Sequence, residues 1–371
     1  MLIELVDVTH RRLLTLLQSA LWNKPPDGGL FVAMEEDDWQ KLFCAAASHG
    51  VIALALDGIM RAPENLTLPR KLKITWAANV DAIERRYDYK TAVAEELAVL
   101  LGKETVPVML FKGMALAAYY PIPRHREFGD LDIYLFGQEQ EAVQCLVKHG
   151  AKKEKHQDKK HINLSYKGVP VELHCFFLGA YHLKKVRRLE NRLLKSLQQD
   201  LPPHQIRMGQ LLHPPANFHA LFLICHTLRH FTQGINFHAL CDWAVFLHAN
   251  KGLIAVEAYR SALAEAGWLK IADAFTALTV TLIGPESEVA PDCQRDRDLE
   301  EKILTDILNP VLMPKQPSFR GKIKYYYRRL VSERWKNELI YPRQYGHRII
   351  SSLFFHLRHP RYTFAKLFNI K

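Results

Sequence analysis

The sequence predicts an α+β protein, in which a small mixed sheet lies between helical N- and C-terminal regions. Two observations carry this prediction. Residues 1–104 and 181–310 repeat apolar residues at helical spacing, whereas residues 105–180 hold short apolar or alternating runs separated by glycine. A third observation separates residues 311–371, which form a basic, aromatic-rich tail. We therefore expect four units with these boundaries.

The N-terminal region is expected to be helical throughout. In "DDWQKLFCAAASHGVIALALDGIM" (37–60), apolar residues recur at helical spacing behind an acidic start, with Asp37 or Asp38 as the N-cap. Lys71–Leu101 predicts one or two long helices that end near Gly102.

The central region predicts the order β-α-β-α-β-β. Its strands are short runs of apolar or alternating residues, and its helices begin or end at glycine. The expected elements are a strand "VPVMLF" (106–111), a helix from "GMALAAYY" (113–120), a strand "DLDIYLF" (130–136), a helix "GQEQEAVQCLVKHG" (137–150), and strands "HINLSY" (161–166) and "VPVELHCFF" (169–177), which the turn-like "KG" joins.

The C-terminal region predicts four helices, a polar loop and a linker. The helices are expected at Ala216–His230, Phe237–Asn250, Ala255–Ala266 and Ile271–Ile283. The loop is "IGPESEVAPDCQRDRD" (283–298) and the linker is "NPVLMPKQPSF" (309–319).

Composition narrows the class of protein. Hydrophobic residues make up 48% and charged residues 24%, as in ordinary soluble proteins. No apolar run reaches the roughly 18 residues of a spanning helix, and "MLIELVDVTHRR" does not resemble an export signal. The six cysteines are scattered without a C-x-x-C pair, which favours a reduced, cytoplasmic chain with buried thiols.

The net charge of +11 belongs to the C-terminal tail. Residues 320–371 contain 13 Lys or Arg and two Asp or Glu, so the remainder is neutral. Three interpretations stay open: amphipathic helices docked on the protein, contact with an anionic membrane surface, or a grip on nucleic acid through stacking and phosphate contacts. The helical stripes would be Ile349, Leu353 and Leu357, and Ile350 and Phe354.

Acidic residues alternate on two of the predicted strands. Asp130 and Asp132 project from one face, since residues two apart on a strand point the same way. Glu172 and His174 share a face of the later strand. If the two strands are neighbours, three carboxylates converge and repel unless cations lie between them. Oxygen ligands favour Mg²⁺ or Mn²⁺, and two such ions can support phosphoryl transfer. A plainer alternative makes Glu172 an edge residue facing water.

Phosphate-binding groups flank these carboxylates. Gly113 begins a helix, where backbone N–H groups bind phosphate, and Lys112 adjoins it. Arg124 and Arg126 lie just before the aspartates, where a guanidinium could hold polyphosphate. The pattern predicts a phosphate cradle beside a metal site.

The segment "LFKGMALAAYY…R…GDLDIYL…VELH" resembles the poorly characterised bacterial nucleotidyltransferase family with Lys-Gly in place of Gly-[Gly/Ser], within the DNA polymerase β-type superfamily. The resemblance covers residues 90–180 and extends loosely to "LICHTLRHF…GINFHALCDW". It implies metal roles for Asp130 and Asp132, a metal or base role for Glu172, and phosphate contacts at Gly113. It also implies a nucleotidyltransferase core for residues 105–180.

One departure from the superfamily concerns the phosphate cradle. Met114 follows Gly113, so no serine can hydrogen-bond the phosphate, and the charge of Lys112 would replace that contact. Either the nucleotide binds differently, or this branch has changed or lost its reaction.

Histidines in the C-terminal helices suggest an acceptor pocket. His226 and His230 share a helix face, and Asp242 lies on the next helix. Thr227 stands where an H-E-x-x-H zinc motif needs glutamate, which argues against zinc. These residues would line an acceptor pocket with His174, or would be packing histidines bonded to Asp242. His174 would otherwise orient its neighbours by hydrogen bonding.

The combined prediction is a nucleotidyltransferase that uses Mg²⁺ or Mn²⁺, held by Asp130, Asp132 and Glu172, to move a nucleoside monophosphate from an NTP such as ATP. Lys112, Gly113 and Arg126 would bind the triphosphate. The acceptor hydroxyl could belong to a small molecule, a peptide or RNA. The alternatives are a nucleotide- or partner-binding module on the same fold, and an RNA-acting enzyme that uses the basic tail.

Overall fold

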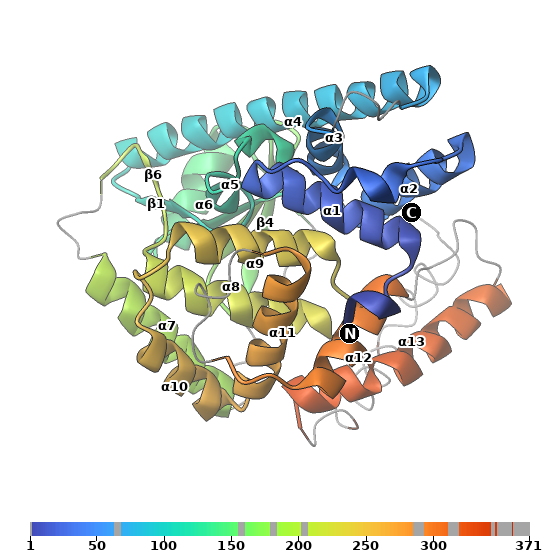
Figure 1. Cartoon of the computed structure of the whole chain (residues 1–371). Coiled ribbons are helices and arrows are strands. Elements are labelled where there is room, and N and C mark those ends of the chain that lie inside the picture. Colours follow the sequence, from blue (N-terminus) through green and yellow to red (C-terminus); the bar gives the residue numbers. More distant parts are fainter. Residues whose placement is uncertain are drawn as a thin grey trace.

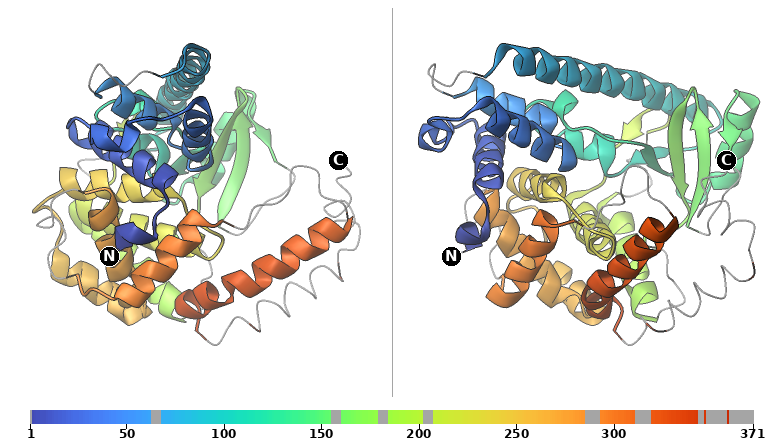
Figure 2. Two further views of the ribbon diagram at one scale, coloured as in Figure 1. Left: turned by 45° about the vertical axis from the view of Figure 1, so that its right-hand side comes forward. Right: turned by 90° about the vertical axis from the view of Figure 1, so that its right-hand side faces the viewer.

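A computed structural model describes residues 2–62, 68–154, 160–178, 184–201, 207–284, 293–310 and 319–342, with Gly346 and Arg358. Within these segments a six-stranded mixed sheet lies among helices (Figures 1 and 2), so the α+β prediction is confirmed. The apolar stripes expected at residues 349–357 lie outside the described residues.

Four helices form the N-terminal part. They are α1 (Val8–Trp22), α2 (Glu36–Ser48), α3 (Ile52–Met60) and α4 (Arg70–Lys103), with 3-10 turns η1 (Leu2–Leu5) and η2 (Gly28–Phe31). The capping prediction at Asp37 or Asp38 is wrong, because both lie inside the first turn of α2 and Glu35 is the cap. There their charges complement the positive end of the helix dipole.

The long helix α4 joins two hydrophobic cores. It has 34 residues and spans roughly 50 Å at 1.5 Å per residue. Figure 2 shows it running from the N-terminal helices to the sheet. Trp76 and Val80, in its first half, pack among the N-terminal helices, whereas Val93 and Leu97, in its second half, pack beneath the sheet. One rigid element therefore positions the sheet against the helical part.

The sheet has the order β3-β4-β5-β2-β1-β6. Among the strands of the described segments, β2–β5 and β1–β6 pair in parallel, and the other neighbours are antiparallel. The predicted order is confirmed, with two additions, β3 and β6, that are each two residues long and too short to show alternation. The elements are β1 (Val108–Leu110), α5 (Gly113–Ala117), η3 (Pro123–His125), β2 (Leu131–Tyr134), α6 (Glu139–Lys148), β3 (Lys152–Lys153), β4 (His161–Tyr166), β5 (Val169–His174) and β6 (Leu211–Leu212).

The two faces of the sheet differ in chemistry. Leu131, Ile133, Val171 and Leu173 pack in one core with α4 and α6. Because side chains alternate along a strand, the residues between them face the C-terminal helices instead. The sheet thus turns an apolar face to α4 and a polar stripe to the rest of the molecule.

The C-terminal helices cover that second face. The four predicted helices are present within a few residues, as α8 (Ala216–Phe231), α9 (Phe237–Ala249), α10 (Val256–Ala266) and α11 (Leu269–Leu282). Three more are α7 (Lys184–Asp200), α12 (Arg297–Leu308) and α13 (Phe319–Ile340). The buried residues of α7 recur every three or four positions, so its sequence carried a helical signal: Val186, Leu189, Leu193 and Leu197.

The beginning of the basic tail docks on these helices. Lys336 of α13 bonds both carboxylate oxygens of Asp306, at 2.9 and 3.0 Å, and the indole N–H of Trp268 donates to the Ile340 carbonyl. Within the described residues, no helix combines the length and the apolar character that crossing a bilayer requires. For residues 319–342, the docking interpretation therefore fits best.

Candidate active site

Three carboxylates meet on the polar face of the sheet. The parallel pairing of β2 and β5 places Asp132 opposite Glu172, and Asp130 immediately precedes β2. Burial, and the neighbouring charges of Asp132 and Asp130, raise the pKa of Glu172 to about 7. Burial and the charge of Asp132 also raise the pKa of Asp130. The structure brings together the three side chains that the sequence singled out.

Asp132 is the most deeply paired of the three. The Lys112 ammonium forms an ion pair with its carboxylate, and His174 Nε2 lies 2.8 Å from its Oδ1. Burial alone would raise the pKa of Asp132, but the charge of Lys112 and the hydrogen bond from His174 hold it well below its usual value. Asp132 is therefore ionised, with a cation and a donor already beside it.

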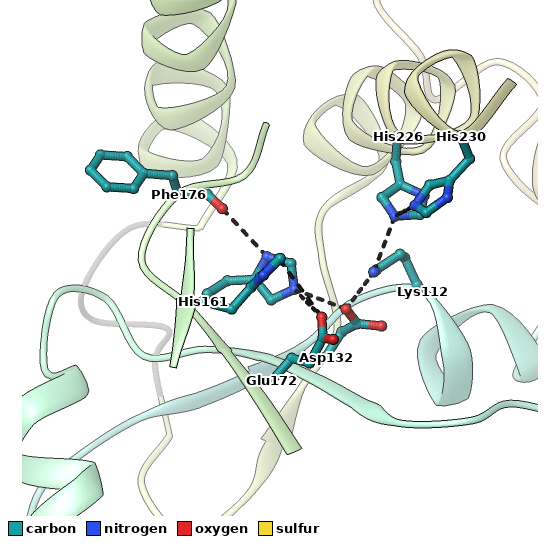
Figure 3. Close-up of polar contacts among 8 residues, drawn as sticks. Lys112, Asp132, His161, Glu172, Phe176, His226 and His230 are labelled. Atoms are coloured by element: carbon teal, nitrogen blue, oxygen red, sulfur yellow. Dashed lines mark hydrogen bonds and ion pairs between the residues drawn. The ribbon is translucent and has the colours of Figure 1, made fainter. Parts of the chain in front are cut away.

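Lys112 connects the carboxylates to the helical part. Its Nζ lies 3.2 Å from His226 Nε2, so the side chain stands between Asp132 and α8 (Figure 3). The residue has φ 53° and ψ −144°, outside the regions that non-glycine residues favour. Such a conformation costs about 1–3 kcal/mol and clusters at functional sites. The turn aims the ammonium across the polar face.

Gly113 follows at the start of α5, also with positive φ, +23°. A Cβ placed there would contact the Phe128 side chain at 3.4 Å and the Asp130 carbonyl oxygen at 3.5 Å. The backbone of the predicted phosphate cradle thus lies directly against the segment that carries the aspartates.

Arg126 has a partner other than the one expected. Its guanidinium donates two hydrogen bonds to Asp242 of α9, at 3.1 and 2.8 Å, and the Tyr120 hydroxyl donates a third at 2.7 Å. Arg126 is only 6% exposed. Arg124 is exposed and pairs with Asp88. A triphosphate contact by Arg126 stays a prediction.

The predicted acceptor residues surround one cavity. Its volume is about 220 Å³, and its walls come from α5, α8, α9 and the segments next to them. Lys112, Arg126, His226, His230 and Asp242 all line it. His174 is not among the lining residues and lies instead beside Asp132.

The two helical histidines contact each other rather than Asp242. Their Nε2 atoms are 3.0 Å apart. Burial and the charges of Lys112 and Arg229 lower the pKa of His230 to about 4, and burial lowers that of His226 strongly as well. Both rings are therefore neutral near pH 7, so they can pass protons or accept hydrogen bonds at the cavity wall.

Two basic residues of the site were not predicted. Lys160 lies just before β4, and burial together with the charges of Arg229 and Lys112 lowers its pKa to about 7. His161 opens β4 directly opposite His174. Both end the charge-rich stretch 148–161, which looks like a solvated loop in the sequence. The two-residue turn Lys167–Gly168 was the available signal, because counting outward from it pairs residue 161 with residue 174.

Comparisons with known proteins give one match. The model of a family described as "Uncharacterised nucleotidyltransferase" matches residues 35–284, which include the whole sheet and helices α8 and α9. No curated protein and no solved structure matches the chain.

Proposed function

The chain belongs to the uncharacterised nucleotidyltransferase family, and from this premise we propose that it is a metal-dependent enzyme that moves a nucleoside monophosphate from an NTP to an acceptor hydroxyl. The observation that carries the proposal is the register of β2 and β5, which places Asp132 beside Glu172 with Asp130 adjacent. An ordinary structural sheet has no need for three neighbouring carboxylates.

Asp130, Asp132 and Glu172 would hold Mg²⁺ or Mn²⁺. Their fit to a dication is supported by the pairing of Asp132 with Glu172 across β2 and β5, with Asp130 next to Asp132 in the chain, because carboxylate oxygens are the ligands that these ions prefer. A divalent ion bound there would neutralise phosphate charge and stabilise the charge that develops during transfer. The chain's own residues would do the remaining work.

Lys112 and the backbone N–H groups at Gly113 would bind the triphosphate at the border between the carboxylates and the cavity. Arg126 would also contact the triphosphate. It lines the same cavity and would keep its hydrogen bond to Asp242. Glu172 would accept the proton of the acceptor hydroxyl as the general base of the transfer. The acceptor oxygen then forms a bond to the α-phosphorus, the bond to the β-phosphate oxygen breaks, and pyrophosphate leaves.

The acceptor would approach from the cavity lined by His226, His230 and Asp242. A volume of about 220 Å³ suits a small molecule or the hydroxyl-bearing end of a peptide or RNA, not a whole large ligand. His174 lies beside Asp132, with 2.8 Å between its Nε2 and Asp132 Oδ1.

The proposal is tested with full-length protein, non-hydrolysable NTP analogues and Mg²⁺ in a calorimeter. We expect binding that requires the metal and weakens at least tenfold in Asp132→Asn, because Asp132 pairs with Lys112 and would ligate the ion. Asp81→Asn is the matched control, since this exposed carboxylate forms an ion pair with Arg85 on the surface of α4. Radiolabelled NTPs would then report pyrophosphate release. Absence of nucleotide binding, with Asp132→Asn behaving like wild type, overturns the proposal.

A second candidate is a nucleotide-binding module without turnover. The ion pair between Lys112 and Asp132 favours it, because the ammonium lies on a carboxylate that the metal would need. Met114 favours it too, since no serine follows Gly113. Metal-dependent tightening of NTP binding with no pyrophosphate release from any acceptor mixture would select this candidate.

A further inference from the structure

The hairpin of β4 and β5 adds nitrogen ligands to the carboxylate cluster. His161 pairs with His174 across the hairpin, and Glu172 lies two residues before His174 on the same face. His161 Nε2 is 3.7 Å from Glu172 Oε2, and His174 Nε2 is 3.9 Å from that oxygen. One ligand atom from each residue lies within 4.8 Å of the other two.

These separations fit donors arranged around one cation. Bonds of about 2.0–2.2 Å from a metal to nitrogen and oxygen place neighbouring donors roughly 3–4 Å apart. Asp132 Oδ1 lies beside this group, at 2.8 Å from His174 Nε2, and pairs with the Lys112 ammonium. The group itself holds two imidazoles and one carboxylate.

The surroundings of His174 provide an independent argument. Its Nε2 faces Asp132 and Glu172, while its Nδ1 lies 3.4 Å from the Phe176 carbonyl oxygen (Figure 3). A neutral imidazole has one ring proton, so it can satisfy acceptors on only one side. A cation at Nε2 resolves this conflict, because Nδ1–H then donates to Phe176. Histidine ligands of metals usually donate their other N–H to a carbonyl or carboxylate in this way.

We propose that His161, Glu172 and His174 form a mixed nitrogen–oxygen site that selects a first-row transition metal, such as Mn²⁺, over Mg²⁺. Mg²⁺ prefers oxygen ligands and retains water, whereas imidazole suits Mn²⁺ and its heavier neighbours. The inference rests on the proposed function for the role of the ion, but its test reads metal binding directly.

The test uses metal-stripped full-length protein and Mn²⁺ alone. Electron paramagnetic resonance of free Mn²⁺ gives the affinity, and spin-echo modulation from ¹⁴N reports imidazole bound to the metal. We expect nitrogen modulation in the wild type and, in His161→Asn, Mn²⁺ binding weakened about tenfold or more with little change for Mg²⁺. His149→Asn is the matched control, since this histidine is exposed at the end of α6.

The outcomes separate the two proposals. Mn²⁺ binding without nitrogen modulation, or unchanged binding in His161→Asn, overturns the mixed site while leaving metal-dependent nucleotide binding intact. Nitrogen-coupled Mn²⁺ in a protein that binds no NTP supports the mixed site and overturns the enzyme. If His161→Asn fails to fold, the modulation in the wild type decides alone.

Discussion

Two aspartates with equal burial have opposite surroundings. Asp132 in the sheet and Asp273 in α11 are each 4% exposed. Asp273 is met by both ends of the Arg260 guanidinium, at 2.7 and 3.1 Å. Asp132 shares Lys112 with His226 and has two further carboxylates beside it. The Asp273 carboxylate is matched by one guanidinium that bonds both of its oxygens, whereas Asp132 belongs to a cluster with two other carboxylates.

The difference separates structural charge from functional charge. A buried pair with matched geometry holds two elements together, here α10 and α11. A cluster with excess charge of one sign costs stability unless a ligand completes it, and such clusters occur at functional sites. The pair of Arg126 and Asp242 also has matched geometry, although it lines the cavity in which the triphosphate is proposed to bind. Burial alone would not have told these sites apart.

The largest effect on the free energy of unfolding is expected when the pair of Asp273 and Arg260 is broken. Asp273→Asn removes the charged carboxylate that accepts two hydrogen bonds from the Arg260 guanidinium in a largely buried position, which costs about 3–5 kcal/mol. The free energy of unfolding from urea denaturation measures this loss. Asp37→Asn, which breaks an exposed pair with Lys41, should change it by less than about 1 kcal/mol. Equal effects of the two substitutions would mean that the pair in α10 and α11 is not structural.

A smaller effect of opposite sign is expected in the crowded cluster. In metal-free protein at pH 8, Glu172→Gln removes one of three repelling carboxylates and should stabilise the fold. A pKa raised from 4.5 to about 7 corresponds to roughly 3 kcal/mol, which the partial exposure of Glu172 reduces to about 1–2 kcal/mol.

Urea denaturation with a chelator present measures the effect of Glu172→Gln. Glu96→Gln serves as control, because Glu96 accepts hydrogen bonds from Tyr166 and Lys167 at the surface and should lose stability instead. Destabilisation by Glu172→Gln would show that the carboxylate has a favourable partner in the free protein, and the contrast with Asp273 would fail.

Local patterns explain which parts of the site were predictable. Alternation on two strands placed Asp132 and Glu172 on one face, and the glycine at position 113 indicated a helix start. These features depend on neighbours a few residues apart. The turn at Lys167–Gly168 likewise predicts that His161 pairs with His174. The charged residues before His161 resemble a solvated loop, however, so the position of His161 in the site was not predicted.

Long-range pairing explains the rest. Arg126 and Asp242 are 116 residues apart, and Lys112 and His226 are 114 residues apart. No periodicity relates such positions, so the sequence could place these residues near the site without indicating which would pair. The strand β6 likewise joins the sheet through register with β1 over two residues only. The fold class follows from local patterns, whereas the pairing of side chains around the cavity depends on how the helices pack.

The smallest expected effect concerns the buried histidine His49 and the dependence of stability on pH. His49 has matched surroundings of its own: Nδ1 accepts the Phe237 N–H at 3.3 Å, and the ring stacks on Phe237 at 4.1 Å. Burial and the charge of His10 lower its pKa from 6.5 to about 4. Between pH 4 and pH 6.5 the unfolded chain binds more protons at this residue than the folded chain does. The contribution of neutral His49 to the free energy of unfolding is therefore present above pH 6.5 and is lost as the pH falls toward 4. At pH 6 the loss is about 0.5–1 kcal/mol.

His49→Gln should therefore reduce the loss of stability between pH 7.5 and pH 6, while lowering stability at pH 7.5 because the stacking is removed. Melting temperatures across this range measure both effects, with exposed His149→Gln as the control that keeps the wild-type slope. Parallel curves for His49→Gln and wild type would mean that protonation does not open this contact. A reduced slope would show that burial around His49 disfavours a positive charge, whereas the neighbouring carboxylates around Asp132 favour one.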